Sequence, residues 1–254
     1  YKNPVYTFDV NVIGTVNILE CIRLNPCVKS FVNVTTDKVY ENQEQENYGY
    51  VETDRLNGYD PYSNSKSCSE LVTASYCKSF FSDRNLAVST CRAGNVIGGG
   101  DFSENRIVPD CIKYTVKTIP IIVRNPNSVR PYQHVLEADM FYLMLAMKQY
   151  NNKSYAGNYN IGPADSDCVT TSQLCELFCH FWEGAKWQAK DYQGPHEANF
   201  LKLNCEKAKS ILKWYPRWHV AEAVKKTIEW SKVFVNNGDL KEITSHQILE
   251  YMEE

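Results

Sequence analysis

The pattern of apolar and polar positions alternates between helical and strand periods in the first part of the chain. It predicts, in order, a helix over residues 7–24, a strand over 28–34, a polar loop over 41–59, a helix over 61–81 and a strand over 86–92. Within the first helix, Val12, Val16 and Leu19 recur at helical spacing. The first strand is a β-branched apolar run of the kind found in a sheet buried on both faces. This alternation favours an α/β fold with a parallel sheet.

A glycine-rich segment, AGNVIGGGD, follows the second strand and leads into a less regular half. The pattern there predicts helices over 107–118, 137–149, 171–182, 203–214 and 221–234, a helical tail over 239–254, and strands over 121–125 and 158–162. We therefore expect one domain over residues 1–97 and a second, smaller α/β domain mainly over 98–254. A segment at about 153–162 is expected to return to the first sheet.

Composition and charge exclude some classes of partner. A chain of 254 residues, 43% of them hydrophobic, can build one or two domains. With a net charge of −3 it has no general attraction to nucleic acid or to an anionic membrane. We expect no apolar run that approaches the roughly 18 residues of a membrane span.

The cysteines indicate a reducing compartment. None of the ten forms C-x-x-C, and most lie inside apolar patterns, which predicts reduced thiols in a cytoplasmic protein. Cys175 and Cys179 share a helix face with His180 beside them. Because no second ligand pair has suitable spacing, we expect no metal site.

A possible proton-transfer pair opens the helix predicted over 61–81. Tyr62 and Lys66 are four positions apart and therefore lie on one helix face. A phenol has a pKa near 10, and a neighbouring ammonium favours the phenolate, so such a pair can take a proton from an alcohol. Taken alone, Tyr-x-x-x-Lys is far more often a solvated helix face than a site.

A small polar cluster, Thr36, Asp37 and Lys38, directly follows the strand predicted over 28–34. The carboxyl ends of parallel strands face the ligand crevice of an α/β sheet, so this triplet is well placed for chemistry. The alternative is a purely structural role for the triplet, as a turn capped by Asp37. Together with Tyr62 and Lys66 the cluster is more persuasive, because both groups are expected at the same sheet edge.

Longer motifs in a fixed order carry a family resemblance over nearly the whole chain. They are NVIGTVNILE (11–20), VNVTTDKVYEN (32–42), YVETDRLNGYDPYSNSKSCSELV (50–72), RAGNVIGGGDFSENRIVPD (92–110), RNPNSVRPYQHVLE (124–137) and HEANFLKLNCEKAKSILKWYPRW (196–218). The chain resembles the extended short-chain dehydrogenase/reductase superfamily and, within it, the CDP-glucose 4,6-dehydratases. Sister dehydratases typically carry Asp-Glu where this chain has Asp37-Lys38, so the lysine favours the CDP branch.

The resemblance implies an internal redox cycle on a nucleotide sugar. Tyr62, supported by Lys66 and hydrogen-bonded to Thr36, would deprotonate the glucose C4 hydroxyl as hydride passes to NAD. Lys38 would remove the C5 proton, provided that burial lowers its pKa. Protonated Asp37 would donate to the leaving C6 hydroxyl, and hydride would return to C6. The product would be a 4-keto-6-deoxy sugar.

Further positions match binding residues of the family. For the cofactor these are Asn11, Thr35, Tyr62 and Lys66, although Asn11 could equally pack a helix face against a loop. For the nucleotide sugar they are Asn95, Arg106, Arg124, Arg130 and His134. The arginines suit a pyrophosphate, with surface ion pairs as the alternative. Asn95 could instead belong to a structural turn, and His134 could be a structural histidine.

The fold implied by the resemblance is a doubly wound, Rossmann-type parallel sheet without its first βα units. Such a sheet begins with a strand that runs into G-x-G-x-x-G. Nothing before Asp9 can be that strand, and Gly98–Gly100 lack the spacing. At about 30 residues per unit, we expect that about 90 residues precede this stretch in the whole enzyme. We also expect the 254 residues alone to bind NAD poorly and to turn over little.

Two rival functions remain open from the sequence. A nucleotide-sugar 4-epimerase of the same superfamily needs the Tyr–Lys pair but no acid and base at Asp37 and Lys38. A truncated relative could serve as a non-catalytic binding module. The resemblance also implies a homodimer or higher homo-oligomer built through the helices over 7–24 and 61–81.

Overall fold

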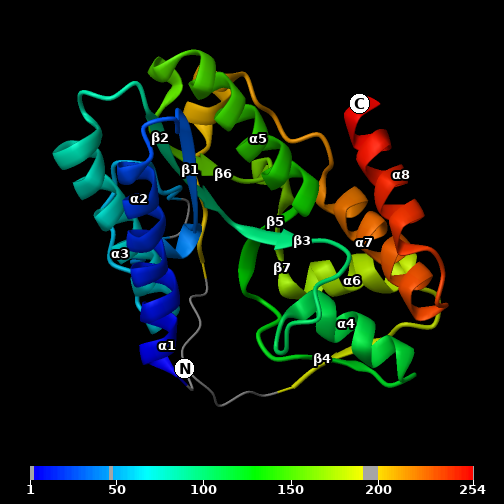
Figure 1. Ribbon diagram of the computed structural model, residues 1–254. Coiled ribbons are helices and arrows are strands. Elements are labelled where there is room, and N and C mark those ends of the chain that lie inside the picture. The colour runs from blue at the N-terminus through cyan, green and yellow to red at the C-terminus, as the bar shows by residue number, and fades with distance from the viewer. Residues whose placement is uncertain (1–2, 46–47, 191–199, 254) are drawn as a thin grey trace. The chain divides into compact units, whose positions relative to one another are not determined.

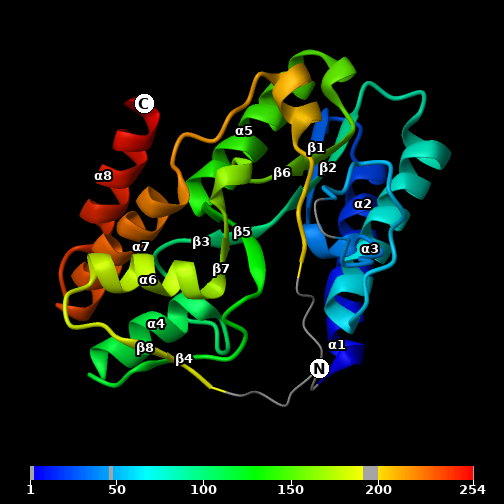
Figure 2. The same ribbon diagram turned by 180° about the vertical axis from the view of Figure 1, so that it is seen from behind.

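The computed structural model describes residues 3–45, 48–190 and 200–253. The chain divides into two compact units, and Figures 1 and 2 show its elements from opposite sides. Unit 1 comprises Tyr1–Gly94, Asp139–Ile161 and Lys202–Tyr215. Unit 2 comprises Asn95–Ala138, Gly162–Leu201 and Pro216–Glu254. All ten cysteines are free thiols.

Unit 1 is built on a parallel sheet, as the sequence predicts. Its strands are β1 (Ser30–Thr36), β2 (Ala87–Ala93) and β6 (Asn158–Ile161), in the order β1-β2-β6. The register pairs Val34 with Cys91, and Cys91 with Tyr159. The carboxyl end of β1 therefore reaches the Thr36–Asp37–Lys38 cluster.

Helices cover both faces of this sheet (Figure 1). One face carries α2 (Gly14–Leu24) and α3 (Pro61–Tyr76), and the other carries α5 (Val135–Asn151). On the α3 side, the Asn33 amide donates to the hydroxyls of Ser69 and Thr73. On the α5 side, the Gln149 amide donates to Ser30 Oγ and the Phe31 carbonyl. Successive side chains of a strand point to opposite faces of the sheet, and this alternation decides which side chains of β1 contact α3.

The first helix is longer than predicted and more apolar than expected. It runs without a break through α1 (Pro4–Phe8), a π-helical turn (Asp9–Ile13) and α2. By length and composition alone, Pro4–Leu24 is apolar enough to cross a membrane, which differs from the expectation that no run approaches that length. Asn3 is the N-cap of this extra turn, and its side chain accepts a hydrogen bond from the Tyr6 backbone N–H, while Pro4 occupies the first helical position.

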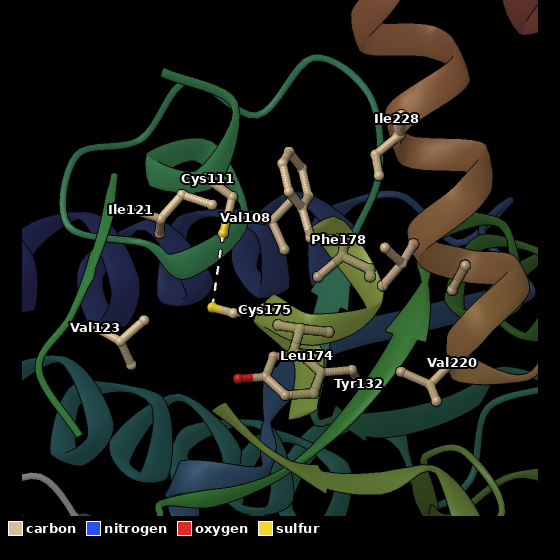
Figure 3. Packing of buried hydrophobic residues seen from close by; sticks show 13 residues of the cluster. Val108, Cys111, Ile121, Val123, Tyr132, Leu174, Cys175, Phe178, Val220 and Ile228 are labelled. Atoms are coloured by element: carbon tan, nitrogen blue, oxygen red, sulfur yellow. Dashed lines mark hydrogen bonds between the residues drawn. The ribbon is translucent and has the colours of Figure 1, made fainter. Parts of the chain in front are cut away.

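The described residues of unit 2 form two further small sheets and four α-helices. The sheets are β3-β5-β7, formed by β3 (Asn95–Ile97), β5 (Val129–His134) and β7 (Cys168–Thr170), and β4-β8, formed by β4 (Ile121–Val123) and β8 (Trp187–Ala189). The helices are α4 (Ile107–Val116), α6 (Thr171–Phe181), α7 (Val220–Val235) and α8 (Leu240–Glu253). Residues of α4, α6 and α7 form one apolar core with strand residues of unit 2, and Val108, Leu174 and Phe178 belong to it (Figure 3).

The sequence pattern missed or misjudged several elements. It did not predict β3, β5, β7 or β8, three of which are only three residues long. The helix predicted over 203–214 was wrong in extent, because helical structure spans only 206–212. Its expected first turn instead pairs with the loop: Tyr50 donates to the Lys202 carbonyl, and Asn204 donates to the Tyr50 carbonyl. Lys213, with φ of 56°, then ends the helical turn in the left-handed region.

Candidate active site

The start of α3 is fixed by local sequence. Asp60 is its N-cap and accepts hydrogen bonds from the backbone N–H groups of Tyr62 and Ser63, while Pro61 occupies the first turn. Gly58 approaches the helix so closely that a Cβ there would lie 2.3 Å from the Ser63 carbonyl carbon. These contacts set where the first turn of α3, and with it Tyr62, lies in unit 1.

Tyr62 and Lys66 occupy successive turns of α3, as the sequence predicts. The Tyr62 side chain is 44% exposed. Lys66 Nζ donates to the carbonyl of Val34, near the carboxyl end of β1, at 3.3 Å. Burial lowers the pKa of the Lys66 ammonium. A half-buried cation and an accessible phenol thus share one end of the unit 1 sheet.

The structure places Thr36, Asp37 and Lys38 at the same end. Asp37 is 1% exposed, and Thr36 Oγ1 donates to its carboxylate at 3.0 Å. The expected bond between Thr36 and Tyr62 is not formed, because the Thr36 hydroxyl caps the short turn Asp37–Val39. Lys38 is exposed, so the burial that its predicted role as a base requires is absent from this unit.

Asn11 and Thr35, the other predicted cofactor residues, are bound within unit 1. Asn11 lies in the π-helical turn, and its amide donates to Ser65 Oγ at 2.9 Å. Ser65 Oγ in turn donates to the Tyr62 carbonyl at 2.7 Å. Thr35 is buried and its hydroxyl donates to Glu70 at 2.6 Å. Both side chains therefore brace α3, the helix that carries Tyr62 and Lys66.

A buried ion pair lies next to this cluster. Arg92 of β2 and Glu70 of α3 are 1% and 3% exposed, and the guanidinium binds the carboxylate through Nε and Nη2. Arg92 Nη1 also donates to the Tyr40 hydroxyl at 2.7 Å and the Glu52 carbonyl at 3.0 Å. The sequence interpretation did not include this pair. The signal was present, since Glu70 is four positions after Lys66 and Arg92 is the last residue of the strand predicted over 86–92.

The predicted nucleotide-sugar residues all belong to unit 2. Arg106 precedes α4 and lies 3.3 Å from Asp101, with its side chain 63% exposed. Arg124 follows β4, lies 3.9 Å from Asp110 and donates to Asn105. Arg106 and Arg124 are thus both held near the start of α4. Asn95 lies on β3, paired with Tyr132, and Arg130 lies on the neighbouring strand β5.

His134 is the most deeply buried of these candidates, at 2% exposure. Its Nδ1 accepts a hydrogen bond from the Leu136 backbone, and its ring packs edge-on against Trp218 with centroids 4.9 Å apart. Nε2 is buried without a hydrogen-bond partner among the described residues. Burial lowers the pKa of His134 to about 4. These surroundings favour the structural role over substrate contact.

Because His134 is buried, we expect the free energy of unfolding to fall in acid. Burial holds its pKa at about 4 in the folded chain, below the ordinary histidine value of 6.5, so its contribution is complete above pH 6.5 and is lost as the pH drops toward 4. Between pH 7.5 and 5 this one group should cost about 2 kcal/mol of unfolding free energy. Urea unfolding of a His134→Gln variant should lack that part of the pH dependence.

The control His180→Gln changes an exposed histidine on α6 and should retain the full pH dependence of the parent. Equal pH dependence in the parent and in His134→Gln contradicts the prediction.

Cys175 and Cys179, which the sequence places on one face of α6, have different surroundings: Cys175 is buried and Cys179 is only partly buried. Cys175 points into the core, where its sulfur lies 3.9 Å from that of Cys111 (Figure 3). Across residues 3–45, 48–190 and 200–253, no group of three His, Cys, Asp or Glu side chains could hold a metal ion.

Comparisons with known proteins agree with the fold and find dehydratases and epimerases of nucleotide sugars. Residues 1–227 match the family model described as GDP-mannose 4,6 dehydratase. The chain is 38% identical to a CDP-glucose 4,6-dehydratase of Salmonella typhimurium, an alignment that covers 99% of this chain and 72% of that protein. It is 25% identical to a CDP-paratose 2-epimerase of Salmonella typhi over 90% of this chain and 72% of the epimerase.

Among solved structures, two illustrate the likeness of fold. A dTDP-glucose 4,6-dehydratase of Bacillus anthracis in complex with NAD superimposes with a TM-score of 0.74 at 22% identity, covering 89% of this chain and 68% of that one. A UDP-glucose 4-epimerase of Thermotoga maritima with UDP-glucose gives 0.79 at 21% identity, covering 92% and 73%.

Proposed function

Because this chain belongs to the GDP-mannose 4,6-dehydratase family, we propose that its complete gene product is an NAD-dependent lyase that converts CDP-glucose to CDP-4-keto-6-deoxyglucose. The observation that carries this proposal is the pairing of two chemical groups in unit 1. One is the Tyr62–Lys66 pair on α3, and the other is the buried Asp37 at the end of β1. A 4-epimerase needs only the first of them.

Tyr62 is the residue that takes the proton from the C4 hydroxyl in this proposal. Its side chain is accessible, and Lys66 one turn later keeps a positive charge near the sheet end. That charge favours the phenolate form of a nearby tyrosine. Lys66 is itself anchored to the Val34 carbonyl, which limits the directions in which the ammonium can point.

Asp37 is the acid for the leaving C6 hydroxyl. It is buried, and the Thr36 hydroxyl holds one of its oxygens in a fixed direction. Lys38 follows it directly and remains our candidate for removing the C5 proton, although it is exposed in the described unit. The role of Lys38 therefore requires bound substrate to cover its amine.

The residues present fit the nicotinamide-ribose end of NAD. A phenol and a half-buried ammonium lie at the end of a parallel strand, and both can donate hydrogen bonds to the ribose hydroxyls. When bound, NAD would accept hydride from C4 and return it at C6. Tyr62 and Lys66 would hold it there, and Asn11 and Thr35 would act by bracing α3.

The nucleotide diphosphate is assigned to unit 2. Arg106 and Arg124 are forked cations near the start of α4, and each lies close to a carboxylate that an incoming pyrophosphate could replace. Arg130 on β5 and Asn95 on β3 are further candidates on neighbouring strands. His134 supports β5 rather than the ligand.

Product analysis tests the proposal. The complete gene product, incubated with NAD and CDP-glucose, should yield a sugar nucleotide that has lost one water and carries a C6 methyl group. Recovery of a C4 epimer that keeps its C6 hydroxyl would favour the epimerase. Binding of CDP-glucose without any conversion would favour a non-catalytic relative.

We also propose that the protein is a homodimer built through α1, α2 and α3. Large apolar side chains are exposed on these helices, among them Val5, Val10 and Ile18 on the first helix and Leu71 on α3. Burial of this apolar surface against a second copy explains why Pro4–Leu24 is apolar yet little buried. The ten free thiols agree with a reducing compartment, and we place the protein in the cytoplasm.

A charge on this surface should separate the subunits. Ile18→Glu combined with Leu71→Glu places carboxylates where two apolar surfaces would meet, so light scattering should report the mass of a single chain. The control Leu249→Glu alters an apolar side chain of α8 that is 61% exposed and should leave the dimer intact. A parent protein of single-chain mass, or a double variant that stays dimeric, contradicts the proposal.

A further inference from the structure

We propose that the buried Glu70–Arg92 pair is a positioning device that holds the Tyr62–Lys66 helix in register with the Thr36–Asp37 turn, an inference that rests on the proposed dehydration. Neither residue touches substrate in this proposal. Both act through the residues that they hold, so they are positioning residues rather than catalytic ones.

Glu70 connects α3 to both neighbouring strands. Its carboxylate accepts from Thr35 Oγ1 of β1 at 2.6 Å, from Thr90 Oγ1 of β2 at 3.3 Å and from Arg92 Nε at 2.8 Å. Thr35 immediately precedes Thr36 and Asp37. One side chain of the helix is therefore bonded directly to the strand end that presents the acid.

Arg92 extends the same network to the loop that links the two chemical groups. Its Nη1 donates to the Tyr40 hydroxyl, three residues after Asp37, and to the Glu52 carbonyl. Tyr40 donates in turn to Asn160 of β6 at 2.6 Å, and the Asn160 backbone donates to the Glu52 side chain. The loop that leads from Asp37 to Tyr62 is thus tied at two points to a residue of the sheet.

The spacing along α3 makes this contact effective. Glu70 lies four residues after Lys66 and eight after Tyr62, so all three lie along the same side of the helix. A rotation or slide of α3 would have to break the charged hydrogen bonds at Glu70 before it moved Tyr62 away from Asp37. Charge-assisted, forked bonds have narrow geometric tolerance, which suits them to fixing a register.

Stability alone does not account for such a pair. Replacement of a buried ion pair by apolar residues of similar volume is often neutral or stabilising for the fold. Removal of one partner alone is destabilising, because it leaves a buried charge unpaired. The informative variant therefore replaces both residues, Glu70→Leu with Arg92→Met. It should fold, because no charge is left unpaired, but it lacks the directional bonds.

Two measurements on the complete gene product test the proposal. First, kcat for CDP-glucose should fall by about 10²-fold with KM nearly unchanged, as expected for misplacement of reacting groups. Secondly, lysine-selective NMR in the absence of substrate should show the Lys66 amine titrating closer to the ordinary lysine pKa. That shift is expected because burial against β1, which lowers its pKa in the parent, is relaxed when α3 moves.

The control replaces an ion pair of unit 1 in the same way, Glu206→Leu with Lys209→Met, in which the Glu206 side chain is 72% exposed and that of Lys209 is 30% exposed. It should change neither kcat nor the Lys66 titration. Parental kcat in the Glu70/Arg92 variant, or lost activity with unshifted Lys66, overturns the proposal. If the parent makes no dehydrated product, the proposed function fails, and the Lys66 titration still decides whether the pair positions α3.

Discussion

Replacement of Tyr62 by phenylalanine is expected to lower kcat for CDP-glucose dehydration by about 10³-fold, within the range of a lost general base. The change removes one hydroxyl from a side chain that is 44% exposed, so the fold should not suffer. Binding of CDP-glucose should be nearly unchanged, because the pyrophosphate is assigned to the arginines of unit 2. Steady-state kinetics with calorimetric titration of the nucleotide sugar measures both effects.

A matched control exists three residues earlier. Tyr59→Phe makes the same chemical change at a side chain that is 87% exposed, and it should retain full activity. If Tyr62→Phe keeps more than a tenth of the parental kcat, another group removes the C4 proton and the assignment of Tyr62 is wrong.

Replacement of Asp37 by asparagine is expected to lower kcat by about 10²- to 10³-fold for a different reason. The amide oxygen can still accept the hydrogen bond from Thr36, so the buried site keeps its shape. What is lost is the proton for the leaving C6 hydroxyl. Oxidation at C4 should continue, and substrate recovered from D₂O should carry deuterium at C5, observed by NMR.

The control Asp54→Asn alters a carboxylate of the loop between β1 and α3 that binds Tyr48. It should leave turnover unchanged. Parental turnover in Asp37→Asn removes Asp37 from the acid role, and a fall in turnover without C5 exchange places its effect before the elimination.

Much of unit 1 could be predicted from the sequence because local signals decide it. The β-branched run before Thr36, the alternation with helices and the Asp60-Pro61 cap each specify structure within a few residues. The same signals place Tyr62, Lys66 and Asp37 at one end of the sheet. The parallel order β1-β2-β6 confirms the predicted α/β class.

The side-chain partners could not be predicted because they depend on contacts distant in sequence. Thr36 was expected to bind Tyr62, yet it caps its own turn. Thr35 was assigned to the cofactor, yet its hydroxyl is bound by Glu70, 35 positions away. A sequence pattern shows that two residues can share an edge, and packing decides which atoms meet there.

Unit 2 was less predictable because its strands are short and take their partners from distant segments. In the pairing of β5 with β7, Val129 lies opposite Thr170, and in the pairing of β4 with β8, Ile121 lies opposite Trp187. The missed strands β3, β7 and β8 have three residues each, too few positions for alternation to be detected. The arginines assigned to the nucleotide sugar were recognised through the resemblance, although Arg124 also lies within the strand predicted over 121–125.

Isotopic labelling can follow the hydride, which should leave C4 and return to C6 of the same sugar. The complete gene product with NAD should convert CDP-glucose carrying deuterium at C4 into a product with deuterium in the C6 methyl group, read by NMR and mass spectrometry. Deuterium retained at C4 of an epimer would contradict this account, as would its loss from the product to solvent.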